Sequence, residues 1–372
     1  MTEPEPLRQI GRTCVRLRRR TLSYFAGCDY YRLASHPRVV AALQNGARQN
    51  GLSVSASRLT TGNHVLYAEL EQRLAEFFDA ETATLVGSGY LTNLVAAQAL
   101  AGNFSHALID ARAHPALSDA AEFLDCPVLR FKHRDPGDVA RAAQRCGPEA
   151  RFILLTDGMF SRDGSAAPLG EYLRVLPADA LLLVDDAHGG GVLGATGRGT
   201  LEHARVNRRR VIQTVTLSKA LGVYGGAILG TRSLRQRILD RSRLFAGSTP
   251  LPLPLAQAAL ESITLLRTNR RFHQRLLENA LYLKSRLRDA GLAAPETPGP
   301  IVALFLTRRG AVGRVKNALL RAGIYPSFLR YPGGPADGYF RFVISSEHSR
   351  AQLASLVKAL ATVRTCLSPT ED

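Results

Sequence analysis

The run Val211-Ile212-Gln213-Thr214-Val215-Thr216, followed by Leu217-Ser218-Lys219, shows most directly how this chain folds. Its β-branched residues favour a buried strand, and the glycine-rich residues 222–226 after Lys219 allow another group to approach the backbone closely. Desolvation favours the neutral, nucleophilic form of an amine, so Lys219 is a candidate for covalent catalysis. The alternative is a structural lysine whose long apolar stem carries its charge from a strand end to water.

Lysine is scarce in this protein, which makes each lysine informative. Only five of the 48 basic residues are lysine, and the other 43 are arginine. We expect four of the five to be solvated: Lys132 in a basic loop, and Lys284, Lys316 and Lys358 on helical patterns. Lys219 is the exception.

Short apolar runs alternate with longer helical patterns between about residues 65 and 250. This order predicts an α/β fold with a mostly parallel, seven-stranded sheet covered on both faces. Ligands of such sheets bind beyond the carboxyl ends of the strands, where the sequence places Ser88, Gly89, His114, Asp157, Asp185 and Lys219. The expected strands are residues 82–86, 106–110, 128–131, 152–156, 181–185, 211–216 and 227–229.

The pattern changes after the proline-rich residues 250–254. One long helix is expected at about 255–290, and prolines at 295 and 300 interrupt the chain after it. Strands near 301–306 and 340–344 and a closing helix from about 350 indicate a smaller α+β domain. The sequence therefore predicts an N-terminal segment (1–45), a large domain (46–250) and a C-terminal domain (251–372).

Composition narrows the function classes. The formal net charge is +17, but the arginines are dispersed and no basic stretch is interleaved with aromatic residues, which disfavours a nucleic-acid-binding protein. A basic surface that attracts a phosphate-bearing substrate or an acidic carrier protein is favoured instead. Five dispersed cysteines without a C-x-x-C pair are typical of reduced thiols and not of a zinc site.

No run reaches the roughly 18 to 20 apolar residues that cross a bilayer. The arginine-rich residues 16–20 ahead of Cys28 imitate a signal sequence, but the apolar stretch between them is shorter than the roughly 7 to 15 residues that a signal peptide needs. We expect a cytoplasmic protein.

Three further features could carry chemistry. The run Leu181-Leu182-Leu183-Val184-Asp185-Asp186-Ala187-His188 ends a buried strand in two carboxylates and a histidine, which could bind a metal or a cationic ring nitrogen. No further metal ligands are evident, and Asp186 could equally cap the next helix. Ser88-Gly89-Tyr90 before a helix could bind phosphate, although small residues are also common in ordinary turns, and a lone His114 could simply lie in a surface loop.

Together, Lys219, Asp185, the Ser88–Tyr90 turn and His114 match the needs of pyridoxal phosphate. The cofactor requires an amine, a carboxylate at the pyridine nitrogen, a phosphate site and a flat group against its ring.

From about residue 29 to the last helix, the chain resembles the α-oxoamine synthases, a family of fold type I pyridoxal-phosphate enzymes. The resemblance rests on several ordered motifs, namely Asp29-Tyr30-Tyr31-Arg32-Leu33-Ala34-Ser35-His36-Pro37, Ser88-Gly89-Tyr90, Asp157-Gly158-Met159-Phe160-Ser161-Arg162-Asp163-Gly164, Val184-Asp185-Asp186-Ala187-His188-Gly189 and Thr216-Leu217-Ser218-Lys219.

The resemblance implies a role for each matching residue. Lys219 is similar to the lysine that binds the cofactor and later removes the substrate α-proton, Asp185 to the partner of the pyridine nitrogen, and His114 to the residue stacked on the ring. His188 and Ser161 would lie near the phenolic oxygen of the ring. The remaining expected contacts are Gly89, Tyr90 and Thr216 at the phosphate, Ser248 or Thr249 from a second subunit, and Arg341 at the carboxylate of the amino acid.

The resemblance also implies a homodimer that condenses a small amino acid, such as L-alanine, with an acyl thioester and releases carbon dioxide. The thioester would be an acyl-CoA, for example pimeloyl-CoA, or an acyl-carrier protein, and family members that act in biotin synthesis are nearest in length. Alternatives are glycine with a short acyl-CoA, a long-chain or carrier-bound acyl donor, and a binding protein on this fold that does not turn over.

The chain departs from the family around the expected substrates. Cys28 replaces an asparagine, Arg32 a glycine, Ala113 another asparagine, and Tyr339 the first of two paired arginines. Ser53, Ser55 and Ala56 stand in a stretch that is glycine-rich in the family. Substrate identity is therefore left open.

Overall fold

The computed structural model describes residues 5–292, 294–330 and 334–368, except for the side chain of residue 309. The chain folds into two compact units, one of residues 36–160 and 166–269, the other of residues 1–35, 161–165 and 270–372. The divisions predicted at residues 45 and 250 stay predictions. Within the described residues, none of the helices combines the length and apolar character that a membrane span requires.

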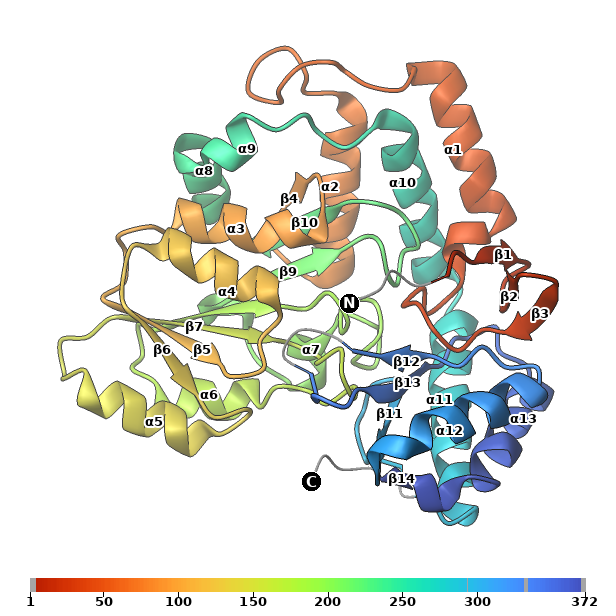
Figure 1. Cartoon of the computed structure of the whole chain (residues 1–372). Coiled ribbons are helices and arrows are strands. Elements are labelled where there is room, and N and C mark those ends of the chain that lie inside the picture. Colours follow the sequence, from red (N-terminus) through yellow and green to blue (C-terminus); the bar gives the residue numbers. More distant parts are fainter. Residues whose placement is uncertain (1–4, 293, 331–333, 369–372) are drawn as a thin grey trace. The chain divides into compact units, whose positions relative to one another are not determined.

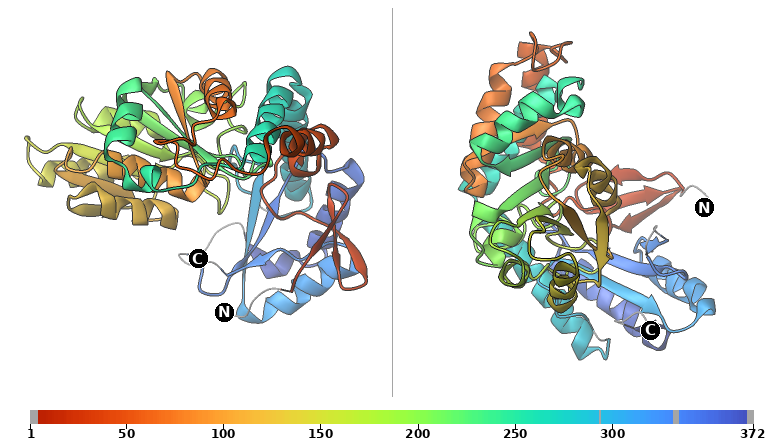
Figure 2. Two further views of the ribbon diagram at one scale, coloured as in Figure 1. Left: turned by 90° about the horizontal axis from the view of Figure 1, so that it is seen from above. Right: turned by 90° about the vertical axis from the view of Figure 1, so that its left-hand side faces the viewer.

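The first unit is built on the seven-stranded sheet that the sequence predicts (Figures 1 and 2). The strand order is β4-β10-β9-β8-β7-β5-β6, and only β10 runs antiparallel to its neighbours. The strands are β4 (Thr82–Val86), β5 (His106–Asp110), β6 (Val128–Phe131), β7 (Phe152–Asp157), β8 (Leu181–Asp185), β9 (Val211–Thr216) and β10 (Gly226–Gly230).

Helices cover both faces of this sheet, and the side-chain alternation of the strands assigns each residue to a face. Ile153 and Leu155 of β7 pack with the α3, α4, α8 and α9 side, whereas Phe152 and Leu154 pack with α5, α6 and α7. Burial on both faces explains why the strands read as continuous apolar runs. The helices of this unit are α1 (Pro37–Asn50), α2 (Val65–Phe78), α3 (Gly89–Ala99), α4 (Pro115–Ala121), α5 (Pro136–Arg145), α6 (Leu169–Val175), α7 (Thr200–His203), α8 (Arg232–Arg241), α9 (Arg243–Ala246) and α10 (Leu253–Thr268).

The second unit contains an antiparallel sheet of order β12-β13-β11-β14 covered by three helices. Val302 and Leu304 of β11 pack with α11, α12 and α13, and the alternate residues, including Ala303, lie on the opposite face. The elements are α11 (Arg271–Asp289), β11 (Ile301–Leu306), α12 (Val312–Arg321), β12 (Phe328–Leu329), β13 (Tyr339–Val343), α13 (Arg350–Ala361) and β14 (Leu367–Ser368).

The predicted long helix is two helices. α10 ends at Thr268 and α11 begins at Arg271. Asn269, with φ −122° and ψ 83°, leaves the helical region, consistent with the low helix propensity of threonine and asparagine at the junction.

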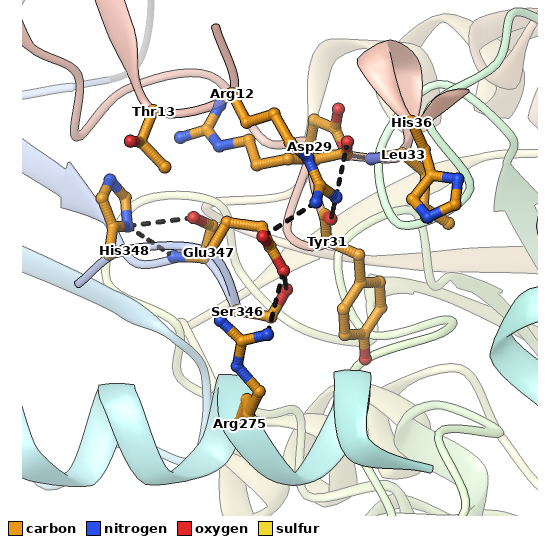
Figure 3. A network of polar contacts seen from close by, with 12 residues as sticks. Arg12, Thr13, Asp29, Tyr31, Leu33, His36, Arg275, Ser346, Glu347 and His348 are labelled. Carbon is orange, nitrogen blue, oxygen red and sulfur yellow. Dashed lines mark hydrogen bonds and ion pairs between the residues drawn. The ribbon is translucent and has the colours of Figure 1, made fainter. Parts of the chain in front are cut away.

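The N-terminal residues form a three-stranded sheet, β1 (Arg8–Ile10), β2 (Cys14–Leu17) and β3 (Arg20–Ser23), within the second unit. Glu347 anchors it, accepting from Arg12 Nη1 at 2.8 Å while Arg275 Nη1 of α11 lies 3.4 Å from its other oxygen (Figure 3). Arg12 Nη2 also donates to the carbonyl of Tyr31 at 3.2 Å. The bond between Arg12 and Glu347 joins residues that are 335 positions apart in the sequence.

Candidate active site

Asp185 ends β8 with a carboxylate whose two oxygens are both fixed. Oδ2 accepts from Nδ2 of Asn93 at 2.6 Å, and Oδ1 accepts from the backbone N–H of Ala187 at 3.0 Å. Asn93, on α3, accepts in turn from Oγ1 of Thr214 at 2.7 Å. Sequence reasoning missed Asn93, although an asparagine on a largely apolar helix was a usable indication. Together these bonds give the Asp185 carboxylate one orientation.

The adjacent Asp186 is structural. It is fully buried and accepts from the backbone N–H and hydroxyl of Thr200 at 2.8 and 2.6 Å, and from Nε2 of Gln213 at 2.6 Å. Burial raises the pKa of its carboxyl. Asp186 does bind the start of a helix, as expected, but it accepts from the first N–H of α7, at Thr200, which lies 14 positions further along the chain.

Both oxygens of Asp186 are therefore used, which argues against a metal held by Asp185, Asp186 and His188. Over the described residues, no group of three or more histidine, cysteine or carboxylate side chains could hold a metal ion. His188 itself is buried, with 6% exposure. All five cysteines are free thiols.

His114 is the N-cap of α4, and two hydrogen bonds fix it. Its backbone N–H donates to Oδ2 of Asp157 at 2.8 Å, and its Nδ1 accepts from the backbone N–H of Ala116 at 3.2 Å. Since Nδ1 is an acceptor, the neutral ring carries its proton on Nε2. Burial lowers the pKa of His114, with Asp185 acting to raise it and Lys219 to lower it. His114 is thus a held, half-buried ring beside Asp185 and Lys219, and not a free surface histidine.

Asp157, the last residue of β7, shares this neighbourhood. Burial raises its pKa well above that of an ordinary aspartate, and the nearby Asp185 raises it further, while the His114 bond and Lys219 lower it. Two carboxyl groups in one buried place compete for one negative charge, so the arrangement favours a proton on Asp157.

Lys219 lies in the turn after β9 and is half-buried, less enclosed than the strand residues before it. Its carbonyl accepts from the N–H of Gly222 at 3.0 Å, and Leu217 and Val223 close the same loop with a backbone bond of 2.8 Å. The amine acts electrostatically on both His114 and Asp157. The structure therefore brings together the lysine, the carboxylate and the imidazole that the sequence singled out.

The expected phosphate site is the start of α3. Ser88 caps the helix by accepting from the N–H of Leu91 at 3.3 Å. Gly89 lies so close to Thr216 that a Cβ atom at this position would be 2.6 Å from the Thr216 Cβ. The positive end of the helix dipole and a buried threonine beside it suit an anion. Tyr90 is 42% exposed and donates its hydroxyl to Asp119.

Ser248 and Thr249 follow α9. The hydroxyl of Ser248 donates to the carbonyl of Leu244, and Thr249 is exposed.

Arg341 and Ser161 belong to the second unit and contact each other. Nη1 of Arg341 donates to the carbonyl of Ser161 at 3.0 Å, and Nη2 lies 3.9 Å from Sγ of Cys28. Nε is buried and has no hydrogen-bond partner in the described part of the chain. A thiol is a weak acceptor, so the guanidinium keeps donor capacity for an anion.

Two of the departures from the family have clear structural effects. Arg32 adopts φ +54°, a conformation that suits the family's glycine, and its side chain is 4% exposed. It donates to the carbonyl of Tyr24 at 3.2 Å and lies 5.6 Å from the centre of the Tyr24 ring. Tyr339 stacks on Phe305 and, with it, contacts the guanidinium of Arg162.

Comparisons with known proteins agree with this geometry. Residues 26–360 match the model of the aminotransferase class I and II family. The 8-amino-7-oxononanoate synthase of Xylella fastidiosa (strain M23) is 36% identical over 348 residues, covering 92% of this chain and 86% of the relative. The enzyme of the same name from Methylobacterium radiotolerans is 37% identical, covering 93% and 89%.

The chain belongs to the α-oxoamine synthase family. As a member it is a pyridoxal-phosphate-dependent acyltransferase of fold type I. Among solved structures, serine palmitoyltransferase from S. paucimobilis with bound PLP is similar at a TM-score of 0.90 and 26% identity, covering 97% of this chain and 93% of that one. The alternative of a binding protein without turnover is therefore discarded.

The residues present fit this cofactor. The oriented carboxylate of Asp185, the amine of Lys219 and the ring of His114 are neighbours, and Gly89 lets the start of α3 lie directly against Thr216.

Proposed function

We propose that this α-oxoamine synthase condenses L-alanine with an acyl thioester, pimeloyl-CoA or a pimeloyl carrier protein, and releases carbon dioxide, as an 8-amino-7-oxononanoate synthase of biotin synthesis. The observation that carries the proposal is the grouping of Asp185, His114 and Lys219. The names of relatives at 36 to 37% identity supply the substrate class.

Bound pyridoxal phosphate supplies an electron-withdrawing ring that stabilises negative charge on the substrate Cα. Asp185, held by Asn93 and Ala187, would keep the pyridine nitrogen protonated, and His114 would pack against the ring. Lys219 would bind the cofactor and, once released from it, accept the substrate α-proton on Nζ. Gly89, Tyr90 and Thr216 would hold the phosphate, while His188 and Ser161 would lie near the phenolic oxygen.

Arg341 binds the carboxylate of the amino acid. The donor capacity left on its guanidinium supports this role, and no carboxylate in the described residues forms an ion pair with it. We further propose a cytoplasmic homodimer in which Ser248 or Thr249 of one subunit reaches the phosphate bound by the other.

A second candidate, a long-chain oxoamine synthase, has one observation in its favour. The serine palmitoyltransferase fold matches at a TM-score of 0.90, whereas that of 8-amino-7-oxononanoate synthase from Francisella tularensis matches at 0.79. A carrier-bound donor would suit the net charge of +17.

The test is a matrix of alanine, glycine and serine against pimeloyl-, acetyl- and palmitoyl-CoA and a pimeloyl carrier protein, with thiol release as the readout. We expect the highest kcat/KM for alanine with a pimeloyl donor. Preference for serine with palmitoyl-CoA would favour the second candidate. Lys219→Ala should abolish turnover and the visible absorbance band of the bound cofactor, and a colourless wild-type protein that ignores added cofactor would refute both.

A further inference from the structure

Lys284 is a buried cation that the reaction scheme above does not use. The sequence predicts a solvated lysine on a helix, and that prediction is wrong: Lys284 faces the interior from α11 and is 6% exposed. A lysine that leaves water must have its donors satisfied. Its Nζ donates to the carbonyl of Thr297 at 2.6 Å, to the hydroxyl of Thr297 at 3.1 Å and to the carbonyl of Gly299 at 2.7 Å.

The acceptors of Lys284 lie in a loop that holds a second segment. Oγ1 of Thr297 donates to the carbonyl of Asp163 at 2.9 Å, and the N–H of Gly299 donates to the carbonyl of Gly164 at 3.0 Å. The approach is close, because a Cβ on Gly164 would lie 3.2 Å from the Cα of Gly299. The segment Ser161–Ser165 is thereby fixed to the loop that Lys284 binds.

The other end of this segment orients Arg341, since the carbonyl of Ser161 accepts from its Nη1 at 3.0 Å. The loop also continues into β11, which pairs with β13, where Ala303 lies opposite Arg341. A series of hydrogen bonds and a short stretch of backbone therefore link Lys284 through Thr297 and Asp163 to Arg341.

We propose that Lys284 is a positioning residue for the amino-acid substrate: it fixes Ser161–Ser165 so that the Ser161 carbonyl holds Arg341 ready to bind the substrate carboxylate. The proposal rests on the role proposed above for Arg341. Three bonds from a buried ammonium give the loop a rigidity that an apolar side chain of similar length would not supply.

The test compares Lys284→Met with Lys358→Met in the full-length, cofactor-loaded enzyme. Lys358 is an exposed lysine of α13 in the same unit and is the matched control. For Lys284→Met we expect KM and Kd of the amino acid to rise about tenfold, equivalent to ~1.4 kcal/mol, with kcat and the KM of the thioester little changed. The amides of Ser165 and Gly299 should exchange hydrogen faster. Lys358→Met should alter none of these.

Arg341→Ala and the double variant separate the two proposals. If Lys284 acts through Arg341, Arg341→Ala weakens amino-acid binding and Lys284→Met adds no further loss to it. Additive losses, or a Lys284→Met enzyme with unchanged amino-acid affinity, would overturn the positioning role alone. An Arg341→Ala enzyme with unchanged affinity would overturn the role of Arg341 and the positioning role with it.

Thr297→Val is the second variant in case Lys284→Met does not fold. It removes the two hydroxyl bonds of Thr297, from Lys284 and to Asp163, and leaves both carbonyl bonds of Lys284 in place. The same rise in amino-acid KM at little-changed kcat is expected, and an unchanged KM would refute the proposal.

Discussion

The backbone N–H of His114 donates to Oδ2 of Asp157 at 2.8 Å, so the imidazole at the start of α4 is held by a carboxyl group at the end of β7. This bond uses the main chain of His114, while Nδ1 of its ring accepts from the backbone N–H of Ala116 at 3.2 Å. It also explains how Asp157 is accommodated so close to Asp185: one of its oxygens is satisfied, and burial raises the pKa of the carboxyl and so favours a proton on it.

Asp157→Asn should change how stability depends on pH. The pKa of Asp157 is raised in the folded protein, whereas in the unfolded chain an aspartate has a pKa of about 3.9. At a pH above that unfolded pKa, the unfolded chain therefore loses a proton that the folded protein retains. Stability is then lost as pH rises toward the folded pKa, and an asparagine escapes that loss. We expect the apparent Tm of cofactor-free Asp157→Asn, relative to wild type, to increase as the pH rises from about 4 to about 7, a range that begins at the pKa of an unfolded aspartate. Asp179→Asn, at an exposed site, is the control, and a constant Tm difference would contradict the raised pKa.

Asn93→Ala should weaken both the fold and cofactor binding. It leaves Oδ2 of Asp185 without the Asn93 donor and the hydroxyl of Thr214 with only the longer, 3.4 Å bond to the carbonyl of Val184. Losing a hydrogen bond to a charged group costs about 1.5–3 kcal/mol. Denaturant unfolding and titration with pyridoxal phosphate measure the two effects. Thr214→Val keeps the bond between Asn93 and Asp185 and should have the smaller effect on cofactor affinity. Equal losses for the two variants would show that Asn93 does not act through Asp185.

Gly89→Ala tests the expected phosphate site. The added methyl group would lie 2.6 Å from Cβ and 2.7 Å from Oγ1 of Thr216, so either the helix start or the threonine must move. We expect the Kd for pyridoxal phosphate to rise at least about tenfold, or ~1.4 kcal/mol. Gly87→Ala, where a Cβ meets nothing within 4 Å, should bind the cofactor as the wild type does. Similar affinities for the two variants would place the phosphate elsewhere.

Lys284 should make the stability of the protein depend on pH in the alkaline range. Burial lowers its pKa from 10.5 to about 8, with Arg288 lowering it and Asp163 raising it. Between those values the unfolded chain binds more protons than the folded protein, so this group makes stability rise with pH. Relative to Lys284→Met, the wild type should therefore gain apparent Tm from pH 8 to 10. A Tm difference between wild type and variant that stays constant over this range would mean that Lys284 keeps an ordinary pKa.

The large sheet could be predicted closely because its strands are short apolar runs separated by helices. Five of the seven expected strands coincide with the observed ones, and β7 and β10 are longer by one and two residues. Asp185 and Lys219 could be selected because each follows such a run. Strand ends are well defined by a change from apolar to polar residues, and the parallel order brings those ends to one edge.

The features that could not be predicted depend on contacts between residues that are distant in sequence. The burial of Lys284 is decided by carbonyl groups of residues 297 and 299, and helical periodicity contains no information about acceptors in another segment. The break at Asn269 was missed because apolar residues continue on both sides of it. Asn93 is explained only by the carboxylate 92 positions later that it binds.

Three glycines surround the carboxylate of Asp186. A Cβ on Gly158, Gly189 or Gly199 would lie 2.0 to 2.3 Å from one of its oxygens. The four positions form an interdependent set, because none of the glycines can gain a side chain while the aspartate carboxylate keeps its place. In related sequences, a side chain at any of the three glycine positions should therefore be accompanied by a replacement of the aspartate. This covariation would identify related chains independently of the catalytic residues.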